Sequence, residues 1–307
     1  MQDGATLTRT AEVAKKMADK ISQIPGVRSA LQINGFNGEN TSFIIAELEP
    51  WSKRKSSKLS ITNIMKEARI EAGKFAEATT FVTQPPAITG LGMFGGFEYQ
   101  LLDKGDRTPE QLYVEAQKLM TAAQTDKKYS GYFSRLYSSY TASMPQVVVN
   151  INEEKAMAQA VPISEIYATL AAQYGATYIN DFNKFGRVYR VYMQADAPYR
   201  EDLSDFSKVF VKNAYGEMLP LTSVIETKNI IGPYELTRFN LYPSITINGT
   251  AANNVSSGDA IRAMEELSNK ILPKDMDFAW SGTSLQEKQS AGQLGPVLAM
   301  ALPFVYL

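Results

Sequence analysis

Apolar positions near the start of the chain change from helical to strand spacing. In residues 8–24 they recur every three or four positions, which places them on one face of a helix. They are Ala14, Met17, Ile21 and Ile24. Pro25 and Gly26 are expected to end this helix. Residues 27–36 and 42–50 are then predicted to form two strands of a hairpin across a Gly/Asn-rich turn.

A second helix is predicted to begin at Ser60, a residue type that suits the N-cap position. Its apolar side carries Ile61, Ile64, Ala68 and Phe75. A strand over residues 79–84 should follow, before Pro85 and Pro86. The resulting order is helix, strand, strand, helix, strand. One more strand in front would complete a βαββαβ unit, whose two helices cover one face of a sheet.

Helix and strand patterns recur beyond residue 96. Phe97, Tyr99 and Leu101 alternate as in a strand, and a capping box at 108–111 predicts a helix before a strand at 132–137. A similar pair returns late, with a helix near 261–271 and a strand at 277–282. The intervening insertion is predicted to contain strands at 146–151, 187–194 and 208–213, with helices at 153–160 and from Ser164 to Gly175.

Composition limits the chemistry that is available. The chain has 31 Lys and Arg against 32 Asp and Glu, so its net charge of −1 favours no polyanion, and we expect no nucleic-acid partner. Because histidine and cysteine are absent, histidine-based nucleophile systems, thiolate ligands and histidine zinc sites are excluded. Adjacent carboxylates could act as acid and base, but neighbouring residues on a helix point about 100° apart. No metal, cofactor or enzymatic activity is expected.

The last residues, 294–307, read LGPVLAMALPFVYL without a charge. This pattern predicts the start of a transmembrane helix, which would need roughly 20 apolar residues in full. A buried C-terminal helix or strand is the alternative, although Pro296 and Pro303 suit a packed helix poorly.

Several long motifs occur in the order found in one family of membrane transporters. They are GATLTRT, INGF, PPAI, GATYINDFNKFGRVYRVYMQ, NAYGEMLPLTSV, YELTRFNLYPSITINGTAA and WSGTSLQEK. Together they resemble the second large periplasmic loop of resistance-nodulation-division (RND) multidrug efflux transporters, of the hydrophobe/amphiphile subfamily. The resemblance extends over nearly the whole chain.

The resemblance implies an α+β fold with two βαβ-type, ferredoxin-like porter subdomains. The first would be residues 1–90 without its first strand, and the second residues 91–144 plus 233–292. A mixed α/β docking subdomain, 145–232, would be inserted into the second, and 293–307 would begin the transmembrane helix. The implied protein is a homotrimer in the inner membrane of a Gram-negative bacterium, with this region in the periplasm.

The implied function is proton-driven export of amphiphiles such as drugs, dyes, detergents and bile acids, with a periplasmic adaptor protein and an outer-membrane channel as partners. The proton-titrating carboxylates of the family belong to its membrane helices and lie outside this sequence. The hairpin near Asn213 to Met218 is expected to face the channel or adaptor. Export of lipids or of an endogenous metabolite is an alternative, as is a periplasmic domain that only binds other proteins.

The resemblance also implies binding residues. The deep pocket would use Leu31, Ile33, Phe36 and Ile45, and an outer cleft would use Phe81, Thr83, Leu91 and Met93. Leu31 and Ile45 replace residues that are often Phe in relatives, which predicts less ring stacking. The loop from Phe36 to Asn40 is shorter than in the known drug pumps. Relatives carry an arginine near the positions of Tyr137 and Thr141, where Arg135 is the nearby cation. The alternative is that these apolar residues are core residues of a half-buried sheet.

Overall fold

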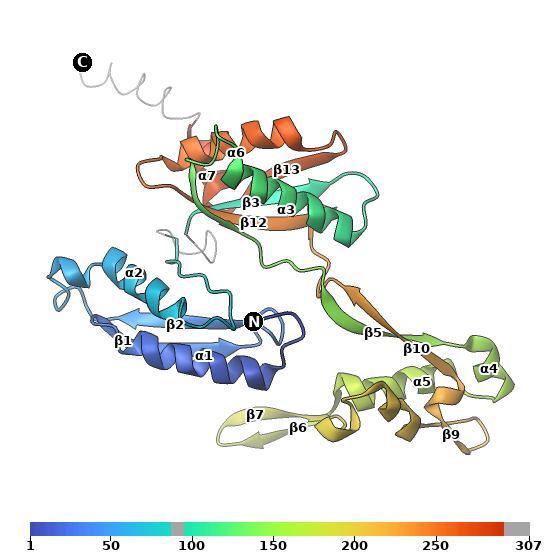
Figure 1. Cartoon of the computed structure of the whole chain (residues 1–307). Helices are drawn as coiled ribbons and strands as arrows, with labels where there is room; N and C mark the ends of the chain where they lie inside the picture. Colours follow the sequence, from blue (N-terminus) through green and yellow to red (C-terminus); the bar gives the residue numbers. More distant parts are fainter. Residues whose placement is uncertain (87–94, 292–307) are drawn as a thin grey trace, which may run out of the picture. The chain divides into compact units, whose positions relative to one another are not determined.

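The computed structural model describes residues 1–86 and 95–291. The chain divides into two compact units (Figure 1). One consists of Met1–Pro145 and Ile231–Leu307, and the other of Gln146–Ile230. Both contain helices and antiparallel strands, which agrees with the predicted α+β class.

The N-terminal part of the first unit is a hairpin covered by two helices. Its elements are α1 (Leu7–Ser22), β1 (Val27–Asn34), β2 (Ser42–Leu48) and α2 (Ile61–Ala72). The predicted hairpin is confirmed, and Ser60 caps α2 by accepting a hydrogen bond from the Asn63 amide. Ile44 and Leu48 of β2 pack against a cluster of α1 and α2 side chains, so both helices lie on the same face of the hairpin. The opposite face is not covered by these helices.

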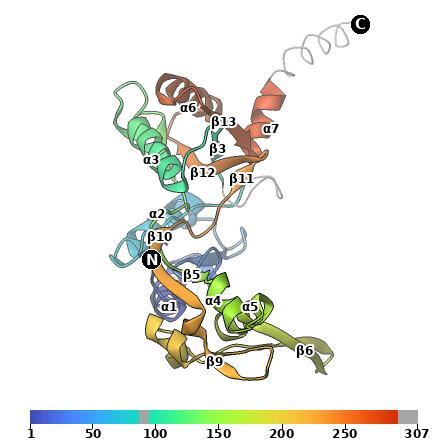
Figure 2. The same ribbon diagram turned by 90° about the vertical axis from the view of Figure 1, so that its right-hand side faces the viewer.

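The rest of this unit consists of a five-stranded antiparallel sheet and its neighbouring helices. The strands are β3 (Phe97–Asp103), β4 (Phe133–Tyr137), β11 (Arg238–Phe239), β12 (Tyr242–Ala251) and β13 (Met276–Ser281). The helices are α3 (Pro109–Thr125), α6 (Ser257–Ile271) and α7 (Gly282–Ala291). The strand order is β11–β12–β3–β13, and β4 also pairs with β12. Helices α3 and α6 cover one face (Figures 1 and 2). Strands from before and after residue 146 thus share one sheet.

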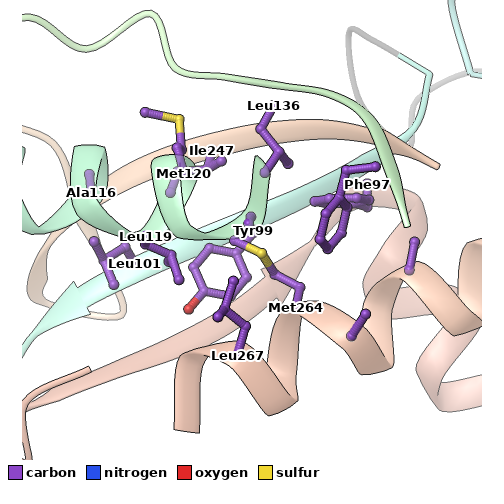
Figure 3. Close-up of a cluster of buried hydrophobic side chains, with 14 of the residues drawn as sticks. Phe97, Tyr99, Leu101, Ala116, Leu119, Met120, Leu136, Ile247, Met264 and Leu267 are labelled. Carbon is purple, nitrogen blue, oxygen red and sulfur yellow. The ribbon is translucent and has the colours of Figure 1, made fainter. Parts of the chain in front are cut away.

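The core of this sheet is closely packed between the strands and the two helices (Figure 3). Tyr99, Leu119 and Met264, from β3, α3 and α6, are each fully buried. The Tyr99 hydroxyl lies 2.7 Å from Ser268 Oγ, which itself donates to the Met264 carbonyl at 2.7 Å. Burial raises the pKa of Tyr99 well above its ordinary range, so this hydroxyl stays neutral at physiological pH.

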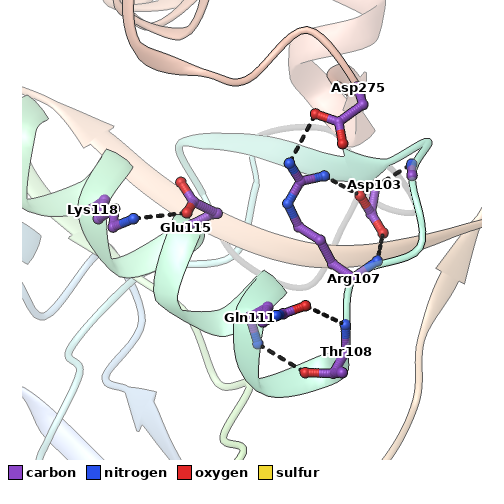
Figure 4. A network of polar contacts seen from close by, with 8 residues as sticks. Asp103, Arg107, Thr108, Gln111, Glu115, Lys118 and Asp275 are labelled. Atoms are coloured by element: carbon purple, nitrogen blue, oxygen red, sulfur yellow. Dashed lines mark hydrogen bonds and ion pairs between the residues drawn. The ribbon is translucent and has the colours of Figure 1, made fainter.

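A buried carboxylate orders the turn between β3 and α3 (Figure 4). Asp103, whose side chain is 1% exposed, accepts hydrogen bonds from the Gly105 and Arg107 amides and from Arg107 Nη1 at 2.8 Å. Arg107 Nη2 also reaches Asp275 at 2.8 Å, just before β13. The Arg107 guanidinium therefore connects the turn between β3 and α3 to the segment that precedes β13.

The predicted capping box is present at the start of α3. Gln111 N donates to Thr108 Oγ1, and Thr108 N donates to Gln111 Oε1 at 3.0 Å. Replacing Thr108 with alanine should lower the free energy of unfolding by about 1 kcal/mol, because the Gln111 amide loses its acceptor. The measurement is urea denaturation. Thr125→Ala, at the exposed end of α3, is the control and should change stability by less. Equal effects of the two substitutions would contradict a capping role.

The chain enters the second unit through one strand and leaves it through the strand that pairs with the first. Its elements are β5 (Met144–Ile151), α4 (Glu153–Ala158), α5 (Ile163–Leu170), β6 (Thr177–Lys184), β7 (Arg187–Met193), β8 (Phe210–Lys212), β9 (Met218–Pro220) and β10 (Ile225–Gly232). β5 pairs with β10, and Asn152 N donates to the Val224 carbonyl at 2.8 Å. The core includes Ile166, Val211 and Leu221, each fully buried.

The structure of this unit differs from the sequence predictions in two places. The N-cap of α5 is Pro162, so Ser164 lies inside the helix. β6 was not predicted, and it forms a hairpin with β7 in which each residue of β7 is exposed. Arg187 and Arg190 therefore lie on a strand that is exposed on both faces. In Figures 1 and 2 this hairpin extends away from α5, and the buried cluster of this unit contains none of its described side chains.

The expected strand at 79–84 is also absent, because its carbonyl groups have other partners. Arg135 Nη2 donates to the Thr80 carbonyl at 2.8 Å, and Arg69 Nη2 contacts the Val82 carbonyl at 3.5 Å. The Gln84 carbonyl accepts from the Gly95 amide at 2.8 Å. Side chains and a loop amide thus replace the neighbouring strand that a ladder would need.

Candidate functional site

An apolar patch covers the outer face of the β1–β2 hairpin. Leu31 lies opposite Ile45, and Ile33 lies opposite Phe43 in the antiparallel register. Because side chains alternate between the two faces of a strand, all four point away from the face that Ile44 and Leu48 turn towards the helices. Leu31, Ile33 and Ile45 are 59, 39 and 43% exposed. We call these four side chains and Phe36 the hairpin patch.

Phe36 extends the hairpin patch from the turn that follows β1. Its ring stacks on Phe43, with centroids 5.7 Å apart and an interplanar angle of 28°. The turn is compact because Gly35 and Gly38 both have positive φ, which glycine adopts without strain. Gly35 N donates to the Thr41 carbonyl at 2.8 Å and closes the turn. A ring is thus held beside the aliphatic pairs.

The structure contradicts the alternative that Leu31, Ile33, Ile45 and Phe81 are core side chains. Exposed fractions of 39–59% for the three aliphatic residues, 44% for Phe36 and 41% for Phe81 are far from those of the buried cluster beneath the hairpin. Exposed apolar side chains that adjoin one another are typical of surfaces that bind a ligand, another protein or a membrane. The structure brings Leu31, Ile33, Phe36 and Ile45 together on one surface.

A second group of side chains surrounds Phe81. Its ring stacks on Tyr137 of β4 with centroids 4.3 Å apart, and the Arg135 guanidinium carbon lies 4.4 Å from the Phe81 ring centroid. A cavity of about 340 Å³ opens beside them. It is lined by Phe81, Gln117, Met120, Thr121, Gln124, Arg135, Leu136, Tyr137 and Ser138. We call it the Phe81 cavity.

Thr83, the other described residue of the predicted cleft, is not among those lining the Phe81 cavity. Thr83 lies two residues from Phe81 in the extended segment, and its hydroxyl donates to the Gln84 carbonyl at 3.3 Å. Leu91 and Met93 lie outside the described residues. The cavity walls from α3 were not predicted, because Met120 and Gln124 follow the same helical pattern as ordinary core and surface positions.

Two of the carboxylate pairs in the sequence, Glu265/Glu266 and Asp275/Asp277, have structural partners. Glu265 accepts from Trp280 Nε1 at 2.7 Å, and Glu266 pairs with Lys128 at 2.7 Å. Asp275 pairs with Arg107, and Asp277 pairs with Lys104 at 2.5 Å. These cations lower the pKa values of Glu266, Asp275 and Asp277. A carboxylic acid that donates protons near neutral pH needs the opposite shift.

In the part of the chain that the structure describes, no helix is both long and apolar enough to cross a bilayer. The predicted transmembrane segment, 293–307, lies outside that part.

Comparison with known proteins gives the class to which this fold and these surfaces belong. The sequence matches the AcrB/AcrD/AcrF family over residues 1–307. The chain belongs to this family, and the resemblance to RND multidrug efflux transporters is confirmed.

Individual relatives agree with this assignment. The chain is 33% identical to the multidrug resistance protein MdtF of Escherichia coli K12 over 314 residues, which cover 100% of the chain and 30% of MdtF. It is 31% identical to the multidrug export protein AcrF of the same strain, over 99% of the chain and 30% of AcrF. It is also 31% identical to the multidrug/solvent efflux pump membrane transporter MepB of Pseudomonas putida, over 99% of the chain and 29% of MepB. The chain thus spans under a third of these relatives.

Proposed function

We propose that this chain is the periplasmic substrate-binding and docking region of a proton-driven RND exporter of amphiphilic compounds in the inner membrane of a Gram-negative bacterium. The observation that carries the proposal is the hairpin patch. Its five apolar side chains adjoin one another on a surface that no described helix covers, and the chain belongs to a family of multidrug efflux transporters. Contacts of this kind depend weakly on ligand shape, which suits a transporter of unrelated amphiphiles.

The second unit, Gln146–Ile230, would be the docking subdomain. Two exposed residues near the β8–β9 turn support this role, since Tyr215 is 81% and Met218 is 59% exposed. The turn itself is ordered, because Asn213 Oδ1 accepts from the Tyr215 and Glu217 amides at 3.0 and 2.8 Å. An ordered turn with an exposed aromatic tip could contact an adaptor or an outer-membrane channel. The first unit would contribute both porter subdomains to a homotrimer.

The proposal is tested by placing a charge in the hairpin patch of the full-length protein. Ile33→Asp should lower resistance to several unrelated amphiphiles. An unpaired carboxylate in an apolar contact surface costs more than the roughly 1.4 kcal/mol that equals a tenfold loss of affinity. The measurement is the minimum inhibitory concentration of a dye, a detergent and a bile salt, in a host that lacks its own pumps.

Ile70→Asp is the matched control, because Ile70 is an exposed isoleucine, 55% accessible, on α2. It should leave resistance unchanged at equal protein levels. If both substitutions act alike, the hairpin patch does not bind substrate. A deletion of the gene that changes tolerance to copper, silver or zinc ions alone would contradict amphiphile export. A change confined to one endogenous lipid would favour the lipid-export alternative.

A further inference from the structure

Among the described residues that line the Phe81 cavity, one side chain carries a full charge at neutral pH. It is Arg135 of β4, and the others are aromatic, aliphatic or neutral polar. Met120 and Leu136 contribute apolar surface and are themselves buried. The cavity thus combines an apolar wall with a single cationic group.

Arg135 makes no ion pair with any carboxylate of residues 1–86 and 95–291. Its contacts there are the hydrogen bond from Nη2 to the Thr80 carbonyl and the approach to the Phe81 ring. The nearby Arg69 is a like charge, and burial together with this neighbour lowers the pKa of Arg135. The guanidinium nevertheless stays protonated, because an arginine side chain does not lose its proton in proteins.

A partly buried cation without a counter-charge is unfavourable, and an anion in the cavity would remove that cost. A guanidinium has five N–H donors, of which those on Nε and Nη1 make no hydrogen bond within the described part of the chain. They could bind a carboxylate or sulfonate in two-point geometry. The stacked rings of Phe81 and Tyr137 would contact the apolar body of the same ligand.

We propose that Arg135 makes the Phe81 cavity selective for anionic amphiphiles over cationic ones. The inference rests on the proposed function, because it names the substrate class of an export protein. The Thr80 hydrogen bond fixes the position of the guanidinium, and the Phe81 ring limits its orientation. The charge is therefore held in place before a ligand arrives, which reduces the entropy cost of binding.

The test uses three probes that share a decyl tail, namely decanoate, decylammonium and decyl maltoside. Binding to the full chain is followed by NMR with methyl-labelled methionine, because Met120 lines the cavity. Its signal is assigned with Met120→Leu. Decanoate should bind at least about tenfold more tightly than decylammonium, the preference expected from hydrogen bonds to a charged group. Arg135→Gln should bring this ratio close to one, and Arg135→Lys should retain part of it.

Decyl maltoside separates the charge of Arg135 from its structural role, and it should bind the wild type and Arg135→Gln equally. Arg187→Gln, at an exposed arginine of β7, should leave the preference intact. A decanoate preference that survives Arg135→Gln, or decyl maltoside binding that is lost with it, would overturn the inference alone. If none of the probes shifts the Met120 signal, the cavity binds no amphiphile and the inference is overturned. The resistance assay with Ile33→Asp then decides the proposed function separately.

Discussion

Replacing Asp103 with alanine should lower the free energy of unfolding of the five-stranded sheet by about 3–5 kcal/mol, the usual cost of breaking a buried ion pair. Two backbone amides and Arg107 Nη1 lose their acceptor at once. The Arg107 guanidinium, whose side chain is 18% exposed, would also be left with a single carboxylate. The turn that leads into α3 should lose its order.

The matched control for this substitution is Asp275→Ala. Asp275 binds the same guanidinium at the same 2.8 Å, but its side chain is 52% exposed. Exposed ion pairs contribute about 0–1 kcal/mol, so Asp275→Ala should be mild. Stability is measured by urea denaturation, followed through the fluorescence of Trp280 in a Trp51→Phe background. Trp280 is 6% exposed in this sheet and Trp51 is 81% exposed. If Asp103→Ala and Asp275→Ala lowered the free energy of unfolding equally, burial of the carboxylate would not determine how much each ion pair stabilises the sheet.

Replacing Gly249 with valine should lower the stability of the same sheet by about 3 kcal/mol, the upper part of the usual range for overpacking. Gly249 of β12 lies opposite Phe97 and Leu136 in its two neighbouring strands. A Cβ atom there would overlap the Phe97 ring and lie 2.7 Å from Leu136 Cδ2. The ring cannot move aside easily, because it packs edge-on against Phe133 and Trp280 at 5.8 and 5.7 Å.

Gly131→Ala is the control, since a Cβ at Gly131 meets nothing within 4 Å. It should change stability by less than about 0.5 kcal/mol, as expected for an exposed site. The same Trp280 fluorescence reports both variants. A Gly249→Val protein as stable as Gly131→Ala would mean that the Phe97 ring can be accommodated elsewhere in the core.

Local signals in the sequence predicted the elements whose partners are close in the chain. The Ser60 cap and the Thr108 capping box are each completed within three residues, so their residue types suffice. The β1–β2 hairpin follows from alternation across a short turn. β12 was not predicted as a strand, although Ile245 and Ile247 alternate with polar residues. Its partner strands β3 and β4 lie far away in the sequence, and its packing against them depends on Gly249.

Long-range contacts decided the remaining differences. Residues 79–84 have the composition of a strand, but Arg69 and Arg135 bind their carbonyl groups from other elements. Leu31, Ile33, Phe36 and Ile45 of the hairpin patch could be proposed from the family motifs, whereas Phe43 was not predicted. Periodicity alone would have placed Leu31 and Ile33 in a core. The position of Arg135 over Phe81 could not be predicted, because 54 residues separate them and no local pattern relates β4 to this segment.

The paired strands β5 and β10 have an evolutionary consequence for the second unit. Hydrogen-bonded neighbours lie about 4.8 Å apart, so the two ends of the inserted chain are close together. Insertions, deletions or replacement of the segment between these two strands can then occur without altering the strand pairing of the five-stranded sheet. The segment between β5 and β10 could therefore be exchanged between family members while the five-stranded sheet of the first unit keeps its own strand pairing.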